Sequence, residues 1–164
     1  MAERYGVLFC CMGNICRSPS AEGVFRAQLA EAGLQQAVRV DSAGTDGWHV
    51  GEAPDARARH HAALRGYALD DLRARRVEVD DFARFDLVLA MDHDNLARLH
   101  ALCPRGAAAR LRLLMSFAPA AGSAVVPDPY YGGASGFERV LDLIELGCRG
   151  LLAHVRRELV SRPL

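Results

Sequence analysis

The sequence contains no lysine, because all twenty of its lysine-or-arginine residues are arginine. This absence excludes Schiff-base chemistry on a lysine and the nucleotide-binding loops that depend on one. The chain also lacks an excess of charge, since twenty acidic residues balance the arginines to a formal net charge of zero. We therefore expect neither nucleic acid nor an anionic membrane surface as a partner.

No apolar stretch approaches the length of a membrane span, and residues 1–4 lack the basic and apolar regions of a signal peptide. The five cysteines, of which Cys10 and Cys11 are adjacent, fit neither a disulfide framework nor paired zinc ligands. We therefore expect a cytoplasmic protein with reduced thiols, no metal and no other cofactor. Because 51% of the 164 residues are hydrophobic, we expect one domain over residues 1–164. A monomer is the default expectation, since the sequence does not distinguish a strongly apolar surface stripe from the core.

Apolar runs of strand length alternate with amphipathic segments of helix length. Strands are expected at 5–10, 37–42, 85–91 and 111–115, and helices at 18–33, 54–66, 92–102 and 135–159. This alternation predicts an α/β fold, a three-layer sandwich in which helices cover both faces of a parallel sheet. In such folds the ligand site lies beyond the carboxyl ends of the strands.

The segment after the first expected strand carries a nucleophile and a cation at a fixed spacing. Residues 11–18 read C-M-G-N-I-C-R-S, with Cys11 and Arg17 separated by five residues. In a chain with five cysteines and twenty arginines, this spacing alone is a weak signal. Its position between an apolar strand and a helix that begins at Ser18 makes it specific.

A loop that curls over a helix N-terminus directs backbone N–H groups and the positive end of the helix dipole at one point, which suits phosphate. The same field favours thiolate over thiol at Cys11, and the planar fork of Arg17 can bind two phosphoryl oxygens. The Ser18 hydroxyl can assist the departing sulfur, and the Asn14 amide can hold the turn. The loop residues expected to bind phosphate are Met12, Gly13, Asn14, Ile15, Cys16 and Ser18.

These cysteines also have simpler interpretations. A free cysteine at a strand end usually serves as a small buried apolar residue, and Cys11 could be one. Cys10, as the last residue of the expected strand, should face the core. Ser18 and Asn14 could likewise serve the structure alone.

An acid is needed to protonate the alkoxide or phenolate that a thiolate expels, and the same carboxylate can later activate water. Asp128 lies in the segment P-D-P-Y-Y-G at 127–132, within the one long loop rich in proline and glycine. Asp128 is therefore the candidate acid. From composition alone it is equally a turn former.

The residues 11–19, C-M-G-N-I-C-R-S-P, together with D-P-Y-Y at 128–131, resemble the low-molecular-weight protein tyrosine phosphatase family. The resemblance extends over nearly the whole chain through further motifs at 41–45, 48–51 and 85–96. It implies a four-stranded parallel sheet with a phosphate-binding loop after the first strand. It also implies metal-independent hydrolysis of phosphotyrosine and small aryl phosphates through a phosphocysteine.

The resemblance further implies a role for each motif residue. Cys11 would be the nucleophile, Arg17 the phosphate clamp, and Asp128 the acid and then the base, while Ser18 assists thiolate departure. The implied partners are phosphotyrosine-containing proteins, a tyrosine kinase among them.

Other roles are implied around the loop. Asn14 and Ser42 would brace the loop, and Asp92 would buttress the site. A deep cleft for an aromatic ring would have walls formed by Met12, Trp48 and Tyr130. For Trp48 and Tyr130 the alternative is simple core packing.

Two positions bear on the resemblance in opposite ways. Cys16 matches the family's companion cysteine, which could form a reversible disulfide with Cys11 and protect it from irreversible oxidation. The chain departs from the family near Leu72, where a histidine often supports the phosphate loop. Support for the loop must then come from elsewhere.

Three other functions stay open. An arsenate reductase on the same scaffold would use further thiols, for which Cys103 and Cys148 are available but far apart in the sequence. A phosphoarginine phosphatase typically carries threonine where Ile15 stands. A phosphate-binding module without turnover would not need the nucleophile, clamp and acid together.

Overall fold

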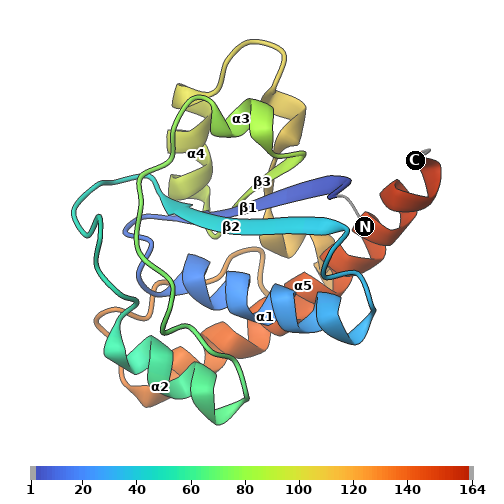
Figure 1. Cartoon of the computed structure of the whole chain (residues 1–164). Helices are drawn as coiled ribbons and strands as arrows, with labels where there is room; N and C mark the ends of the chain where they lie inside the picture. The colour runs from blue at the N-terminus through green and yellow to red at the C-terminus, as the bar shows by residue number, and fades with distance from the viewer. Residues whose placement is uncertain (1–2, 163–164) are drawn as a thin grey trace.

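A computed structural model describes residues 3–162 (Figure 1). The longer elements are β1 (Tyr5–Cys11), α1 (Arg17–Glu31), β2 (Val38–Gly44), α2 (Ala56–Leu64), α3 (Asp81–Arg84), β3 (Leu87–Ala90), α4 (His93–Leu102), β4 (Leu111–Leu113) and α5 (Ala134–Ser161). Three 3₁₀ helices lie around and after β4, namely η1 (Ala108–Arg110), η2 (Leu114–Phe117) and η3 (Pro119–Ala121).

The strands form one parallel sheet in the order β2-β1-β3-β4. Every residue of β1 is buried, because this strand has neighbours on both sides and helices over both faces. In the register of the sheet, Cys10 lies opposite Ala43 of β2 and Ala90 of β3. The carboxyl ends of these three strands therefore meet at one edge, and the segments that follow them gather there.

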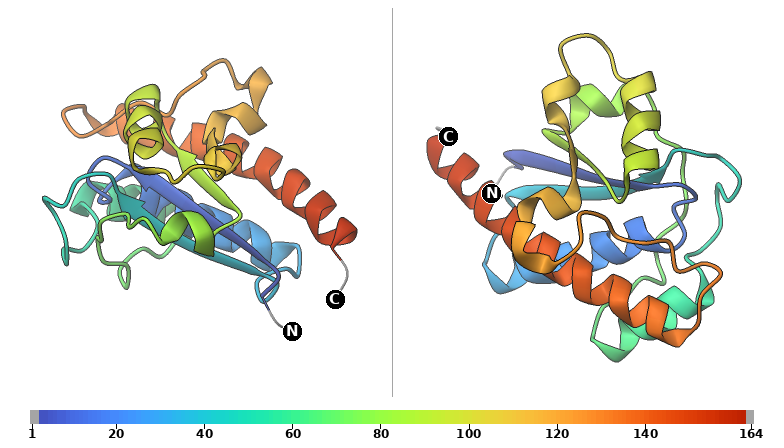
Figure 2. Two further views of the ribbon diagram at one scale, coloured as in Figure 1. Left: turned by 90° about the horizontal axis from the view of Figure 1, so that it is seen from above. Right: turned by 180° about the vertical axis from the view of Figure 1, so that it is seen from behind.

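Successive residues of β1 point into two different cores, as the alternation of a strand requires. Val7 and Phe9 pack with buried residues of α1 and α5, whereas Leu8 packs with Phe82 of α3 and Leu99 of α4. Figures 1 and 2 show α1 and α5 on one face of the sheet and α3 and α4 on the other. The predicted three-layer α/β fold with a four-stranded parallel sheet is confirmed.

Several expected boundaries are wrong. The first strand runs one residue further than expected and ends at Cys11, while Cys10 is fully buried in the core as predicted. The expected strand 111–115 stops after three residues, and Leu114 and Met115 belong to the 3₁₀ helix η2. These two apolar residues pack on α5, where their side chains lie 2.9 and 3.1 Å from the position that a Cβ of Gly147 would occupy.

The short helix α3 was not expected, because its four residues are too few to show a helical period. The helix expected at 54–66 covers only Ala56–Leu64 and begins after its cap, Asp55, whose carboxylate accepts the Arg57 N–H.

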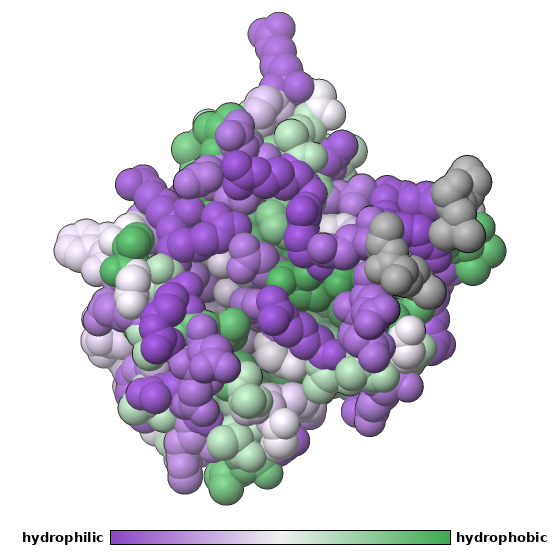
Figure 3. All heavy atoms as spheres, viewed as in Figure 1, coloured by the Kyte–Doolittle hydropathy of each residue, from purple (hydrophilic) through white to green (hydrophobic). Residues whose placement is uncertain are grey.

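Within residues 3–162, none of the helices is both long and apolar enough to cross a membrane. Hydrophilic side chains cover most of the face shown in Figure 3, where the hydrophobic residues form small separate patches.

Candidate active site

The phosphate loop connects the last residue of β1, Cys11, to the first residue of α1, Arg17. The carbonyl oxygens of the loop are bound by surrounding backbone. Those of Cys11, Met12, Ile15 and Cys16 accept the N–H groups of Thr45, Asp46, Asp55 and Ser20 at 2.9, 2.9, 2.8 and 3.2 Å. The loop is therefore tied to the end of β2, to α2 and to α1 at the same time.

Asn14 holds the centre of the loop in a left-handed conformation, with φ of 58°. Its side-chain N–H groups donate to the hydroxyl oxygens of Ser18 at 2.8 Å and Ser42 at 3.0 Å. Its side-chain oxygen accepts the backbone N–H of Arg75 at 2.9 Å. Three separate segments thus fix the conformation of this asparagine.

The sulfur of Cys11 lies 3.0 Å from the hydroxyl oxygen of Ser18. The side chain of Cys11 is almost fully enclosed at 3% exposure, yet it lines the pocket. Burial raises the pKa of the neighbouring Cys16 thiol well above its usual value, and the Asp55 charge adds to the shift. Cys16 is therefore held as a neutral thiol beside the candidate nucleophile.

Arg17 is buried and held by two acceptors. Its Nη1 donates to a carboxylate oxygen of Asp92 at 2.6 Å and to the carbonyl oxygen of Val126 at 3.0 Å. Its Nη2 lies 3.8 Å from a carboxylate oxygen of Asp128. Asp92 is fixed in turn as the N-cap of α4, where it accepts the Asn95 N–H at 2.8 Å.

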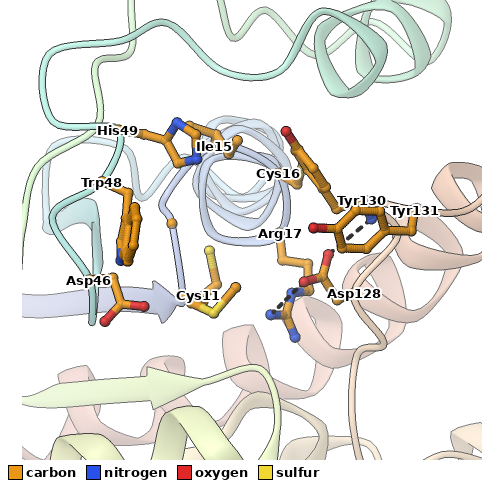
Figure 4. Close-up of a pocket in the computed structure, with 12 residues that line it drawn as sticks. Cys11, Ile15, Cys16, Arg17, Asp46, Trp48, His49, Asp128, Tyr130 and Tyr131 are labelled. Atoms are coloured by element: carbon orange, nitrogen blue, oxygen red, sulfur yellow. Dashed lines mark hydrogen bonds and ion pairs between the residues drawn. The ribbon is translucent and has the colours of Figure 1, made fainter.

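These groups open onto a pocket of about 430 Å³. Figure 4 shows Trp48 on one side, Tyr130 and Tyr131 on the other, and Asp128 directed towards Arg17. With 85% of its surface exposed, Trp48 is not a core residue. The residues that line the pocket are Cys11, Met12, Gly13, Ile15, Cys16, Arg17, Asp46, Trp48, His49, Asp128, Tyr130 and Tyr131.

All the site residues expected from the sequence lie together in this region. Asn14, Ser18, Ser42 and Asp92 do not line the pocket but form hydrogen bonds to the residues that do, or to one another. Sequence reasoning missed three of the lining residues, namely Asp46, His49 and Tyr131. Asp46 directly follows the motif 41–45, whereas His49 and Tyr131 lie within the motifs 48–51 and 128–131.

Sequence reasoning also missed Glu22, whose side chain is only 2% exposed. Its carboxylate accepts the Ser42 hydroxyl at 2.7 Å and lies 2.5 Å from Arg26. Burial raises the pKa of Glu22 above its usual value, although the Ser42 hydroxyl and Arg26 act in the opposite direction. The sequence does contain a signal for this residue. Glu22 precedes Phe25 by three residues and Leu29 by seven, so the helical repeat places this acidic residue on the buried side of α1.

The hydrogen bonds that support the phosphate loop come from groups other than Leu72. The Leu72 N–H binds the Leu69 carbonyl oxygen rather than the phosphate loop. The loop receives its support instead from the Arg75 backbone and, through Ser42, from Glu22.

The thiols that a reductase would use lie elsewhere. Cys148 is a fully buried residue of α5, and Cys103 is half-buried at the end of α4. Neither lines the pocket that contains Cys11. The described part of the chain therefore offers no relay of these thiols to the pocket.

Comparison with known proteins gives a consistent result. The model of the family "low molecular weight phosphotyrosine protein phosphatase" matches residues 6–161. A low molecular weight protein-tyrosine-phosphatase of Streptomyces coelicolor is 50% identical over 161 residues, covering 96% of this chain and 98% of the relative. A crystal structure of a protein tyrosine phosphatase from Entamoeba histolytica is 38% identical with a TM-score of 0.91, covering 94% and 98% of the two chains. A Drosophila arginine phosphatase is 33% identical with a TM-score of 0.84, covering 91% and 96%.

Proposed function

The chain belongs to the low molecular weight phosphotyrosine protein phosphatases, and we propose that its Cys11, Arg17 and Asp128 carry out the hydrolysis. It is a cysteine-dependent protein tyrosine phosphatase, and its substrates are phosphoproteins. The assignment of roles rests on one observation: the sulfur, the guanidinium and the carboxylate line the same pocket.

In the first step the Cys11 thiolate attacks phosphorus, so that a sulfur–phosphorus bond forms while the bond to the tyrosyl oxygen breaks. Asp128, protonated at the start, donates its proton to the departing oxygen. Tyrosine leaves as the neutral phenol, and a phosphocysteine remains.

In the second step water attacks the phosphocysteine, and the Asp128 carboxylate takes a proton from that water. The sulfur–phosphorus bond breaks, inorganic phosphate leaves, and Cys11 returns as a thiolate. The Ser18 oxygen, 3.0 Å from the sulfur, is placed to donate its hydroxyl hydrogen to the leaving thiolate. Asp128 is protonated again at the end of the cycle.

Arg17 supplies electrostatic stabilisation that requires little reorganisation. Because Asp92 and the Val126 carbonyl already fix one side of its guanidinium, the rest of the fork can meet two phosphoryl oxygens. The carbonyl groups of the phosphate loop are bound on the outside, which fits N–H groups that face the phosphate.

The pocket suits an aromatic ring. Trp48 faces Tyr130 and Tyr131 across it, and Ile15 contributes an apolar rather than a hydroxyl surface. These features favour phosphotyrosine over the more polar phosphoarginine.

Hydrolysis of an aryl phosphate by the parent, Cys11→Ser and Asp128→Ala proteins tests the assignment. We expect Cys11→Ser to be inactive but still to bind phosphate, and Asp128→Ala to lose about 10²–10⁴-fold in kcat with little change in KM. A chelator should leave the parent's activity unchanged. An active serine variant, a fully active alanine variant or inhibition by the chelator would contradict this mechanism. Faster turnover of a phosphoarginyl than of a phosphotyrosyl peptide would contradict the substrate.

We further propose a cytoplasmic monomer with one domain, acting on phosphotyrosine proteins that include a tyrosine kinase. The free state of all five cysteines fits a reducing compartment, which a nucleophilic Cys11 requires. An autophosphorylated tyrosine kinase would itself carry the phosphotyrosine that the pocket accepts.

A further inference from the structure

Arg57 lies outside the pocket but contacts the loop that carries Asp128. The centre of its guanidinium is 5.3 Å from the ring centroid of Tyr130 and 4.9 Å from that of Phe137. Tyr130 lines the pocket, whereas Phe137 is buried near the start of α5. The Arg57 cation therefore lies over two aromatic rings, one before the start of α5 and one within its first turn. At these distances each ring forms a favourable cation–π interaction.

The position of Arg57 is determined by Asp55. Nε and Nη2 of Arg57 donate to the two carboxylate oxygens of Asp55 at 3.1 and 3.0 Å, which is the bidentate geometry of a strong pair. The Asp55 carboxylate also accepts the backbone N–H of Arg57 at 2.8 Å as the cap of α2. Both oxygens of the Asp55 carboxylate thus hold the guanidinium at the N-terminus of α2.

Asp55 is in turn attached to the phosphate loop. Its backbone N–H donates to the carbonyl oxygen of Ile15 at 2.8 Å, and its side chain is only 14% exposed. Through Asp55, the position of Arg57 is therefore fixed relative to the loop that contains Cys11.

At the other end, Tyr130 is attached to the candidate acid. The backbone N–H of Tyr130 donates to a carboxylate oxygen of Asp128 at 3.0 Å, which closes a turn of the kind that aspartate favours. A shift of the Tyr130 backbone therefore changes the hydrogen bond that orients the Asp128 carboxylate.

We propose that Arg57 is a positioning residue that bridges the phosphate loop and the acid loop, the segment 127–132 that carries Asp128. It thereby sets the place of the Asp128 carboxylate relative to the leaving group. This inference rests on the proposed role of Asp128 as general acid. Arg57 does not line the pocket and so does not touch the substrate. It acts by holding Tyr130, and through Tyr130 the acid, at the distance that the phosphate loop defines.

The dependence of kcat/KM on the acidity of the leaving phenol tests this role. Phenols that are weak acids need the proton from Asp128, whereas strongly acidic phenols depart without it, so a misplaced acid steepens the dependence. We expect Arg57→Gln and Arg57→Lys to lose about tenfold in kcat/KM with phenyl phosphate but less than about threefold with a strongly acidic phenol. Lysine keeps the charge but not the planar fork.

Arg59→Gln is the matched control, because Arg59 lies in the same first turns of α2. Its side chain donates to the Pro54 carbonyl oxygen and pairs with Asp70, away from the aromatic rings named above. We expect this variant to keep the parent's dependence. The slope of log kcat/KM against the pKa of the leaving phenol compares substrates within one protein preparation. Partial loss of folded protein therefore does not alter this slope.

Two outcomes separate this inference from the proposed function. If Asp128→Ala itself leaves the slope unchanged, the general-acid role fails. If Asp128→Ala steepens the slope but both Arg57 variants match Arg59→Gln, or lower all substrates equally, the positioning role of Arg57 is overturned. In the double variant Arg57→Gln/Asp128→Ala, we expect no further loss beyond that of Asp128→Ala, because both changes remove the same proton transfer.

Discussion

At the scale of single residues, the site depends on side chains whose charge state is determined by burial. The chain of hydrogen bonds from Glu22 passes through Ser42 and Asn14 to Ser18 beside the nucleophile. A carboxylate enclosed in this way pays for its desolvation unless its partners compensate fully, and the raised pKa of Glu22 shows that they do not. The support of the phosphate loop therefore has a cost in stability near neutral pH.

Replacing Glu22 with glutamine should change how stability depends on pH. Since the folded pKa of Glu22 is raised, the native protein keeps a proton that the unfolded chain has already released above about pH 4.3. Stability from this group therefore falls as pH rises from there to the folded pKa, and stays lower above it. In urea unfolding at several pH values, Glu22→Gln should gain stability relative to the parent across that interval.

The exposed Glu31 at the end of α1 provides the control for this measurement. Glu31→Gln should follow the parent's pH dependence. A constant difference between Glu22→Gln and the parent from acid to neutral pH would show that the buried carboxyl has no such effect.

At the scale of elements, close packing of η2 against α5 shapes the edge of the sheet. A side chain at Gly147 would meet Leu114 at 2.9 Å, and one at Gly150 would meet the carbonyl oxygen of Phe117 at 1.9 Å. These glycines, one turn apart on α5, let the 3₁₀ helix lie directly on the helix surface. This contact, rather than strand pairing, accommodates the apolar residues after β4.

Gly150→Ala should therefore destabilise the protein. Alanine gains up to about 1 kcal/mol in helix propensity, but a rigid backbone carbonyl must move to admit its methyl group, and overpacking typically costs about 1–3 kcal/mol. We expect the free energy of unfolding to fall by about 1–2 kcal/mol in denaturant titration. Gly133→Ala, where a methyl group meets open space, should change it by less than about 1 kcal/mol. Equal effects of the two substitutions would contradict this packing argument.

At the scale of the whole molecule, the pocket brings together segments that are far apart in the chain. Arg17 at the start of α1 contacts Asp92 after β3 and the Val126 carbonyl before α5. A ligand that bridges the phosphate loop and Arg17 can bind only when these segments have assembled. Its binding free energy therefore adds to the stability of the entire fold.

Vanadate, as an oxyanion that mimics phosphate, should raise the melting temperature of the parent. At a hundredfold excess over its dissociation constant the gain is about 2.7 kcal/mol, which for a chain of this size corresponds to roughly 5–10 °C. Thermal unfolding with Arg17→Ala should show little of this shift, and sodium chloride at equal ionic strength should show none. A shift of the same size in Arg17→Ala would place the anion somewhere else.

The sequence by itself determined the parts that depend on neighbours in the chain. The alternation of apolar runs indicated the layered fold, and the segment from Cys11 to Ser18 indicated phosphate chemistry, because a strand, a loop and a helix N-terminus create that geometry locally. The local sequence left two interpretations of Asp128, a catalytic acid and a turn former, because a proline- and glycine-rich loop also needs turn formers.

Only the tertiary structure decided which distant groups complete the site. Glu22, through Ser42, and the backbone of Arg75 support the phosphate loop, and Arg57 lies over the Tyr130 ring. Nothing in the local sequence indicates these contacts, because they depend on how α1, α2 and α5 pack against one another. Burial and long-range contact, which set the charge and orientation of such groups, are properties of the folded chain and not of any segment.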